Sequence, residues 1–173
     1  TLLVKELKTN YSEDEIAMLH RRASMWLSKE NFMEGAINHA LAAHDFELAA
    51  RHIERRSHNL LNSLDRHMLE RWLSMLPEKI IWQRSRLILA KAWLFFREWR
   101  LSAMDEALVM AETVLQTEAL EEQAMLAVKG QIACLRAVSL RLRFREIERS
   151  HELSQTALAL LPPSAHGARS SAF

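Results

Sequence analysis

The chain has 173 residues, 49% of them hydrophobic and 26% charged, a composition that can bury a continuous core and excludes a disordered protein. With only three glycines and three prolines it lacks the turn residues of β-sandwiches, barrels and doubly wound sheets. Its 23 basic and 22 acidic residues nearly cancel, so the net charge does not point to nucleic acid or an anionic membrane. Leu, Ala, Glu, Arg and Met dominate, which predicts an all-α fold.

The sequence predicts a cytoplasmic protein with no membrane anchor. Its longest apolar run, from Leu87 to Phe96, is far short of the roughly 20 residues that cross a bilayer. The N-terminal residues are too few for a signal-peptide core, and the missing initiator Met suggests a segment of a longer chain. The single cysteine, Cys134, excludes an internal disulfide and fits a reducing compartment; we expect it to be buried and inert.

Four helices are predicted before Pro77. The first runs from about Glu13 to Ser28, where Ser12 and Glu15 form a capping box. Its apolar face is expected to contain Ile16, Leu19, Ala23, Trp26 and Leu27, with Ser24 on the opposite side. Asn31 is a left-handed stop, and a short second helix follows over residues 33–41. Asp45 caps a third helix whose stripe includes Leu60, Leu61 and Leu64, and Asp65 caps a fourth.

Further helices are predicted after a boundary at residues 77–85, which holds one helical turn over residues 78–82. The fifth, from Arg86 to Glu98, is apolar nearly all round and should be buried on both sides. Trp99 and Arg100 leave room only for a tight turn into the sixth helix, residues 102–116. Three of the five tryptophans, Trp26, Trp72 and Trp93, fall on stripes expected to face the core.

Residues 120–161 have two interpretations. Leu140 to Arg145 alternate apolar and basic side chains, a period typical of a strand, but no partner strand is available. Either one long helix of roughly 60 Å runs through, or a hairpin turns near Ser139–Arg143. Residues 109–115 align with 152–158 at an offset of 43, which favours the hairpin and a right-handed array of stacked antiparallel helix pairs of the tetratricopeptide type. After Pro162 and Pro163, residues 164–173 are expected to be a poorly ordered tail.

Four stretches of the sequence resemble one family: residues 19–27, 36–46, 49–54 and 69–78. This family is that of the MalT-like, LuxR-type transcriptional activators with a signal-transducing ATPase module. The resemblance implies an arm with the first helix pairs over residues 1–77, tetratricopeptide-like sensor repeats over 78–163, and a flexible tail over 164–173. Where that family usually has glycine in the turns between paired helices, this chain has Trp99 and Leu142, which leaves the geometry of these turns open. Asn31 replaces a glycine before the second helix and tolerates the left-handed conformation.

The resemblance implies a non-catalytic segment that binds an inducer small molecule or a protein partner and relays the signal to other domains of the same regulator. ATP and DNA would be bound outside this chain, and the sequence indeed has no phosphate-binding glycine loop, so we expect no cofactor here. The first alternative is a free-standing helical-repeat adaptor that binds protein only. The second is a helical enzyme domain that uses a face rich in His and Arg.

Candidate partner-binding residues come from two groups. Trp82 and Trp99 sit in or beside connections, where exposed aromatic side chains anchor partners, although packing is the alternative. Arg136, Arg141, Arg143 and Arg145, with Arg149, form a basic cluster that is either a solvated hairpin tip or a docking patch for an acidic partner or a phosphate. We predict no catalytic residues and no metal ligands, because the eight histidines have no metal-binding spacing.

Overall fold

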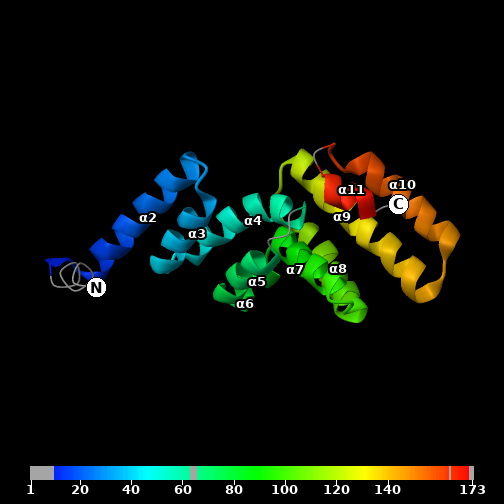
Figure 1. Ribbon diagram of the computed structural model, residues 1–173, viewed down its shortest axis with the longest axis horizontal. Coiled ribbons are helices and arrows are strands. Elements are labelled where there is room, and N and C mark those ends of the chain that lie inside the picture. The colour runs from blue at the N-terminus through cyan, green and yellow to red at the C-terminus, as the bar shows by residue number, and fades with distance from the viewer. Residues whose placement is uncertain (1–9, 63–65, 164, 172–173) are drawn as a thin grey trace.

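The computed structural model describes residues 10–62, 66–163 and 165–171, and this part of the chain is helical without a strand. Helices lie side by side in antiparallel pairs along an elongated array from α2 to α10 (Figure 1). This arrangement confirms the predicted all-α fold of stacked helix pairs. The helices are α2 (Glu13–Lys29), α3 (Met33–Ala42), α4 (Phe46–Asn62), α5 (Arg66–Met75), α6 (Glu78–Trp82), α7 (Ser85–Arg97), α8 (Leu101–Leu115), α9 (Glu122–Ser139), the π-helix η1 (Leu140–Phe144), α10 (Ile147–Leu160) and α11 (His166–Ser171).

No helix in the described ranges combines the length and the apolar character needed to cross a membrane.

The predicted helix boundaries at the N-terminal end are confirmed by their caps. The Ser12 hydroxyl accepts a hydrogen bond from the Glu15 N–H while the Glu15 carboxylate accepts one from the Ser12 N–H, which closes the capping box. Asn31 has φ = 63°, the left-handed conformation that ends α2. The Asp45 carboxylate accepts the Leu48 N–H at 3.0 Å and starts α4. Asp65, however, lies outside the described residues, as do the side chains of Leu60, Leu61 and Leu64.

The buried face of α2 differs from the prediction. Ser24 is fully buried, whereas Leu19 and Trp26 are exposed. Small side chains let α2 approach α3 closely, and the Ser24 hydroxyl donates to the Ala36 carbonyl at 2.7 Å and lies 3.1 Å from Nε2 of His52 on α4. The hydroxyl therefore links three helices, and the contact face of α2 is rotated away from its larger apolar side chains. Trp26 does not belong to the core, in contrast to Trp72 and Trp93, which are buried.

Helix α7 joins two hydrophobic cores. Leu87, Ala90 and Leu94 pack with α3–α6, while Ile88 and Trp93 pack with α8, α9 and the C-terminal segments. The prediction that this helix is buried on both sides is thus confirmed. The turn into α8 is as tight as expected, because Trp99 adopts φ = 58°, the conformation that a glycine would supply at least cost.

A hairpin, not a single long helix, connects α9 to α10. The Ser150 hydroxyl donates to the Ala137 carbonyl at 2.8 Å, and the bare backbone at Gly130 lets Leu161 approach so closely that a Cβ there would lie 2.9 Å from its side chain. The chain reverses at Arg145, with φ = 56°, just beyond the predicted Ser139–Arg143. The difference arises because residues 140–144 continue the helix as a π-turn, so their strand-like alternation produces no strand.

The segment expected to be a flexible tail contains helix α11, which is packed against α4 and α9. Ala165 and Ala168 are buried, and their small side chains allow the close approach. The Arg169 guanidinium donates to the carbonyls of Leu158 and Leu161, both at 3.0 Å, and so satisfies acceptors at the C-terminal end of α10. Prolines 162 and 163 therefore end α10 but not the folded structure.

We expect Cys134 to resist thiol reagents in the folded protein. It is fully buried on α9, its thiol donates to the Ala168 carbonyl at 3.1 Å, and burial raises the pKa of the thiol from 9.0 to about 12. At pH 8 the reactive thiolate is therefore scarce, and the reagent has no access. The reaction of the thiol with Ellman's reagent, followed at pH 8 by the release of thionitrobenzoate, should be slow in buffer. In about 6 M guanidinium, which unfolds the protein, it should be complete within minutes. Equal rates in both solutions would contradict this packing of α11.

Candidate ligand-binding groove

A groove of about 740 Å³ runs between α8, α9 and α10. Its apolar lining comes from one side chain of α8, three of α9 and two of α10. They are Leu115, Met125, Ile132, Ala133, Leu153 and Leu160. The groove exists because α9 packs against both α8 and α10, which leaves an apolar trough over α9 between these two helices. Its volume lies in the range of small-molecule sites.

Polar side chains line the rim of this groove. The Arg136 guanidinium donates to Glu112 at 2.8 Å from Nη2 and 3.4 Å from Nε, so an ion pair spans from α9 to α8. Gln116, Lys129 and Thr156 add an amide, an ammonium and a hydroxyl. An apolar floor with a few polar groups at its edge is suited to an amphipathic ligand whose polar groups would exchange with the Arg136–Glu112 pair.

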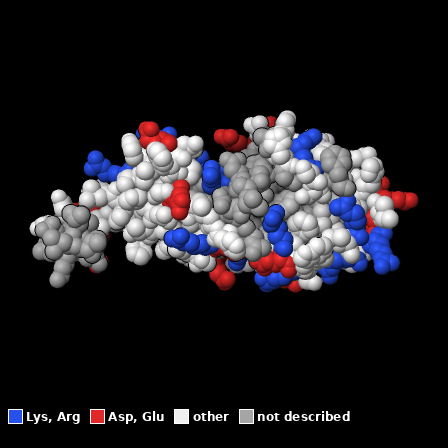
Figure 2. All heavy atoms as spheres, in the orientation of Figure 1, with Lys and Arg blue, Asp and Glu red and all other residues white. Residues whose placement is uncertain are grey.

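Only one of the six predicted partner-binding residues, Arg136, lines the groove. Arg141, Arg143 and Arg145 lie beyond the end of α9, where Arg143 pairs with Asp105 of α8 and its guanidinium lies over the Phe144 ring. Lys and Arg side chains gather at this end of the molecule, at the lower right of Figure 2. The basic cluster is therefore divided between the groove and the hairpin tip, and part of its charge is neutralised internally.

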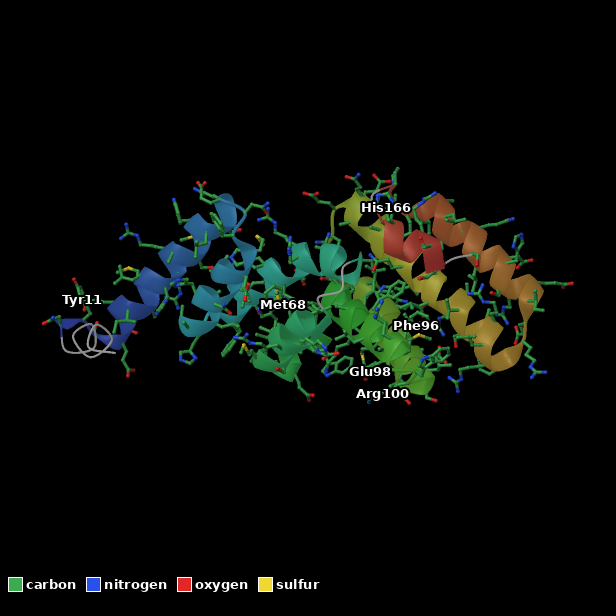
Figure 3. All side chains as sticks on the ribbon, in the orientation of Figure 1. Tyr11, Met68, Phe96, Glu98, Arg100 and His166 are labelled. Carbon is green, nitrogen blue, oxygen red and sulfur yellow. The ribbon has the colours of Figure 1, made fainter. Side chains whose placement is uncertain are left out.

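The two predicted tryptophans, Trp82 and Trp99, lie in different surroundings, and neither lines the groove. Trp82 is half-buried against the C-terminal core, with the Lys91 ammonium 4.8 Å from its ring centre, so packing accounts for it. Trp99 is 72% exposed at the α7–α8 turn, away from the groove lining. Figure 3 shows its neighbours Glu98 and Arg100 at that end of the hairpin, where they pair at 3.3 Å.

Two smaller hollows lie in the N-terminal half. One of about 520 Å³ lies between the α2–α3 turn and α4–α5, next to Phe32, Met68 and Trp72. Another of about 290 Å³ lies between α5, α6 and α7 and has Glu70 and Lys91 in its wall. Both are smaller than the groove, which is therefore the best candidate among these three hollows of the described residues.

Histidines meet in the N-terminal half without forming a metal centre of three ligands in the described ranges. Nδ1 of His20 on α2 lies 2.7 Å from Nδ1 of His39 on α3, a distance at which one ring donates to the other. Burial and the neighbouring His39 lower the pKa of His20. Sequence spacing could not reveal this pair because its members lie on different helices.

Most groove residues were missed in the sequence. Met125, Lys129, Ile132, Ala133 and Arg136 follow helical spacing along one side of α9, but the helix is so broadly apolar that no separate binding face stands out. That side of α9 forms a groove only because α8 and α10 pack on either side of it. The offset of 43 between the repeats is the sequence feature closest to the groove, because it predicts the hairpin of α9 and α10 but not the hollow beside it.

Known proteins of two kinds are similar to this chain. The serine/threonine-protein kinase PknK of Mycobacterium tuberculosis (strain H37Rv) is 32% identical over 155 residues, which cover 88% of this chain and 14% of the kinase. The HTH-type transcriptional regulator MalT of Klebsiella pneumoniae (strain 342) is 30% identical over 148 residues, which cover 86% of this chain and 16% of the regulator. The chain spans about one-seventh of the length of these relatives.

No protein-family model and no solved structure matches the chain. The similarity to MalT supports the predicted MalT-like relationship at this level of identity.

Proposed function

We propose that this chain is a non-catalytic regulatory segment of a longer, cytoplasmic, MalT-like and LuxR-type regulator. It binds an inducer small molecule or a protein partner in the groove between α8, α9 and α10. Binding is relayed through the helix pairs to an ATPase module and a DNA-binding module that lie outside this chain. The segment itself holds no cofactor, no catalytic site and no metal.

The observation that carries this proposal is the similarity of one segment to two proteins with different outputs. One relative is a transcriptional regulator and the other is a protein kinase. Because DNA binding and phosphoryl transfer need unrelated sites, a segment that matches both is best explained by an input or coupling role. The groove between α8, α9 and α10 is a site at which such an input could bind.

The packing of α7 supports the relay. This helix contributes to both hydrophobic cores, so a change in the angle between α8 and α9 moves side chains that also touch the N-terminal half. A ligand that displaces Glu112 from Arg136 would remove a link between those two helices. Coupling of this kind needs a difference in ligand affinity between two arrangements of the helix pairs.

A tetratricopeptide-like protein–protein adaptor is the second candidate. It is favoured by the exposed Trp99, Phe144 and Ile147 at the tips of the α7–α8 and α9–α10 hairpins. A partner that bound only these tips would leave the groove unused.

The test is to fill the groove in the longer protein. Thr156 is exposed on α10 and lines the groove, so Thr156→Trp fills it without overpacking the core. Gln155→Trp places the same side chain on the exposed outer side of α10 as a matched control. We expect deletion of the gene to change a defined set of transcripts, Thr156→Trp to alter the same set, and Gln155→Trp to match the wild type at equal protein levels.

Two results would contradict the proposal. If Thr156→Trp gives the wild-type transcript profile, the groove is not the input site. If deletion of the gene changes no transcripts under any growth condition tested, the transcriptional role itself is wrong.

A further inference from the structure

Helix α2 carries a second apolar face that no described residue covers. Met18 and Trp26 are 52% and 59% exposed, and Tyr11, Leu19 and Met25 are likewise exposed. In Figure 1, α2 lies at the end of the row of labelled helices, and Tyr11 lies at its N-terminal end in Figure 3. Large apolar side chains that gather on one helix face are typical of an interaction surface.

This outer face is distinct from the one that holds α2 in the fold. Ser24 and Leu27 point toward α3, and a Cβ at Gly35 would lie 3.1 Å from the Leu27 side chain, so the inner face is closely packed. Tyr11, Met18 and Met25 are spaced by seven residues, as are Leu19 and Trp26, which places them along the opposite side. The packing of α2 against α3 therefore does not use the outer face.

The charges on the outer face are arranged for self-pairing. Glu15, Arg22 and Lys29 are exposed, are spaced by seven residues and follow the same stripe. When two such helices lie antiparallel with Arg22 at the centre, Glu15 of each faces Lys29 of the other. In a parallel pair the same residues would face their own copies and repel. The antiparallel arrangement also sets Met18 against Met25 and Leu19 against Trp26 of the other copy.

We propose that two copies of this chain associate through antiparallel α2 helices, related by a two-fold axis near Arg22. A two-fold interface uses the same patch on both copies. This face is complementary to itself in the seven-residue spacing of its apolar side chains and in its charges. Helix α2 has 17 residues and is about 25 Å long, so the contact is at the small end of specific interfaces and the dimer is a weak one. The two Arg22 side chains near the axis weaken it further.

Sedimentation velocity of the 173-residue chain from about 1 to 200 µM tests the proposal, since weak specific interfaces dissociate in the micromolar range. We expect a reversible monomer–dimer equilibrium that Trp26→Lys abolishes. Val109→Lys changes an equally exposed apolar side chain on α8 and should leave the equilibrium unchanged. Circular dichroism checks that each variant keeps its helix content.

Charge variants test the antiparallel register. Lys29→Glu places an acidic residue opposite Glu15 of the other copy at both ends of the contact and should weaken the dimer by roughly tenfold. Arg22→Leu should strengthen association because it removes the like charges at the axis. A chain that stays monomeric to 200 µM, or a dimer that survives Trp26→Lys, overturns the proposal; a dimer that Lys29→Glu strengthens overturns the register.

Discussion

Replacing Trp93 with alanine is expected to lower the free energy of unfolding by about 3–5 kcal/mol, the range for large aromatic truncations in cores. Trp93 is 6% exposed and belongs to the helix that joins the two cores. Its ring packs edge-on against Phe96, and its indole N–H donates to Oε1 of Gln131 at 3.1 Å. Truncation therefore leaves a cavity and also deprives the buried Gln131 amide of a partner.

Chemical denaturation followed by circular dichroism measures this effect. Trp99→Ala removes the same ring from an exposed position and should change the free energy of unfolding by less than about 0.5 kcal/mol. Trp93→Phe should fall between the two because it keeps part of the volume but loses the hydrogen bond. An unfolding midpoint for Trp93→Ala within error of the wild type would show that α7 is not central to the array.

Replacing Arg84 with methionine is expected to cost about 3 kcal/mol, because it removes the guanidinium that is hydrogen-bonded to a buried carboxylate. Nη1 of Arg84 donates to both carboxylate oxygens of Glu54 at 3.2 Å, and Nη2 donates to Glu47. The Glu54 side chain is 9% exposed and that of Arg84 is 21% exposed. This cluster ties α4 to the start of α7.

The pH dependence of that loss follows from Glu54. Burial raises the pKa of Glu54, although Arg84 opposes the rise. Without Arg84 the folded-state pKa rises further above the unfolded value, so the penalty is full at high pH and falls as the pH drops through the folded-state pKa. The difference between variant and wild type should therefore be larger at pH 8 than at pH 5.

Two control variants make this result specific. Glu54→Gln in the Arg84→Met background removes the buried charge and should recover part of the loss. Arg100→Met breaks the exposed pair with Glu98 and should cost less than about 1 kcal/mol. If Arg84→Met and Arg100→Met cost the same, the junction between α4 and α7 does not depend on this ion pair.

Helix ends could be predicted from the sequence because their signals are local. Ser12 and Asp45 cap their helices through side chains that reach only three residues along the chain, and Asn31 stops α2 by its own backbone conformation. The buried face of α2 could not be predicted in the same way. The small Ser24 side chain lies at the contact and donates to a carbonyl on α3 that is distant in sequence, whereas Leu19 and Trp26 are exposed.

The C-terminal structure shows the same limit. Small residues and prolines after α10 indicate a tail when they are considered alone, yet α11 is held by Arg169 and by the thiol of Cys134. The sequence predicts Arg136 as a partner-binding residue but does not predict the groove that it lines. Arg136 and Arg143 are near in sequence, but their partners, Glu112 and Asp105, hold them at different places along α8.

The distance between spin labels at positions 129 and 159 tests most directly whether the groove can exist. Lys129 and Ala159 are exposed on α9 and α10, and Cys134→Ala removes the native thiol. In the folded-back hairpin, Gly130 lies against Leu160 and Leu161. Packed helix axes are roughly 10 Å apart, so the hairpin predicts a separation below about 20 Å once the lengths of the two labels are added. This separation is at the lower end of the range that dipolar spectroscopy measures. A distribution centred near 45 Å, which is about 1.5 Å for each of the residues between the labels, would show one continuous helix and would leave no groove beside α8.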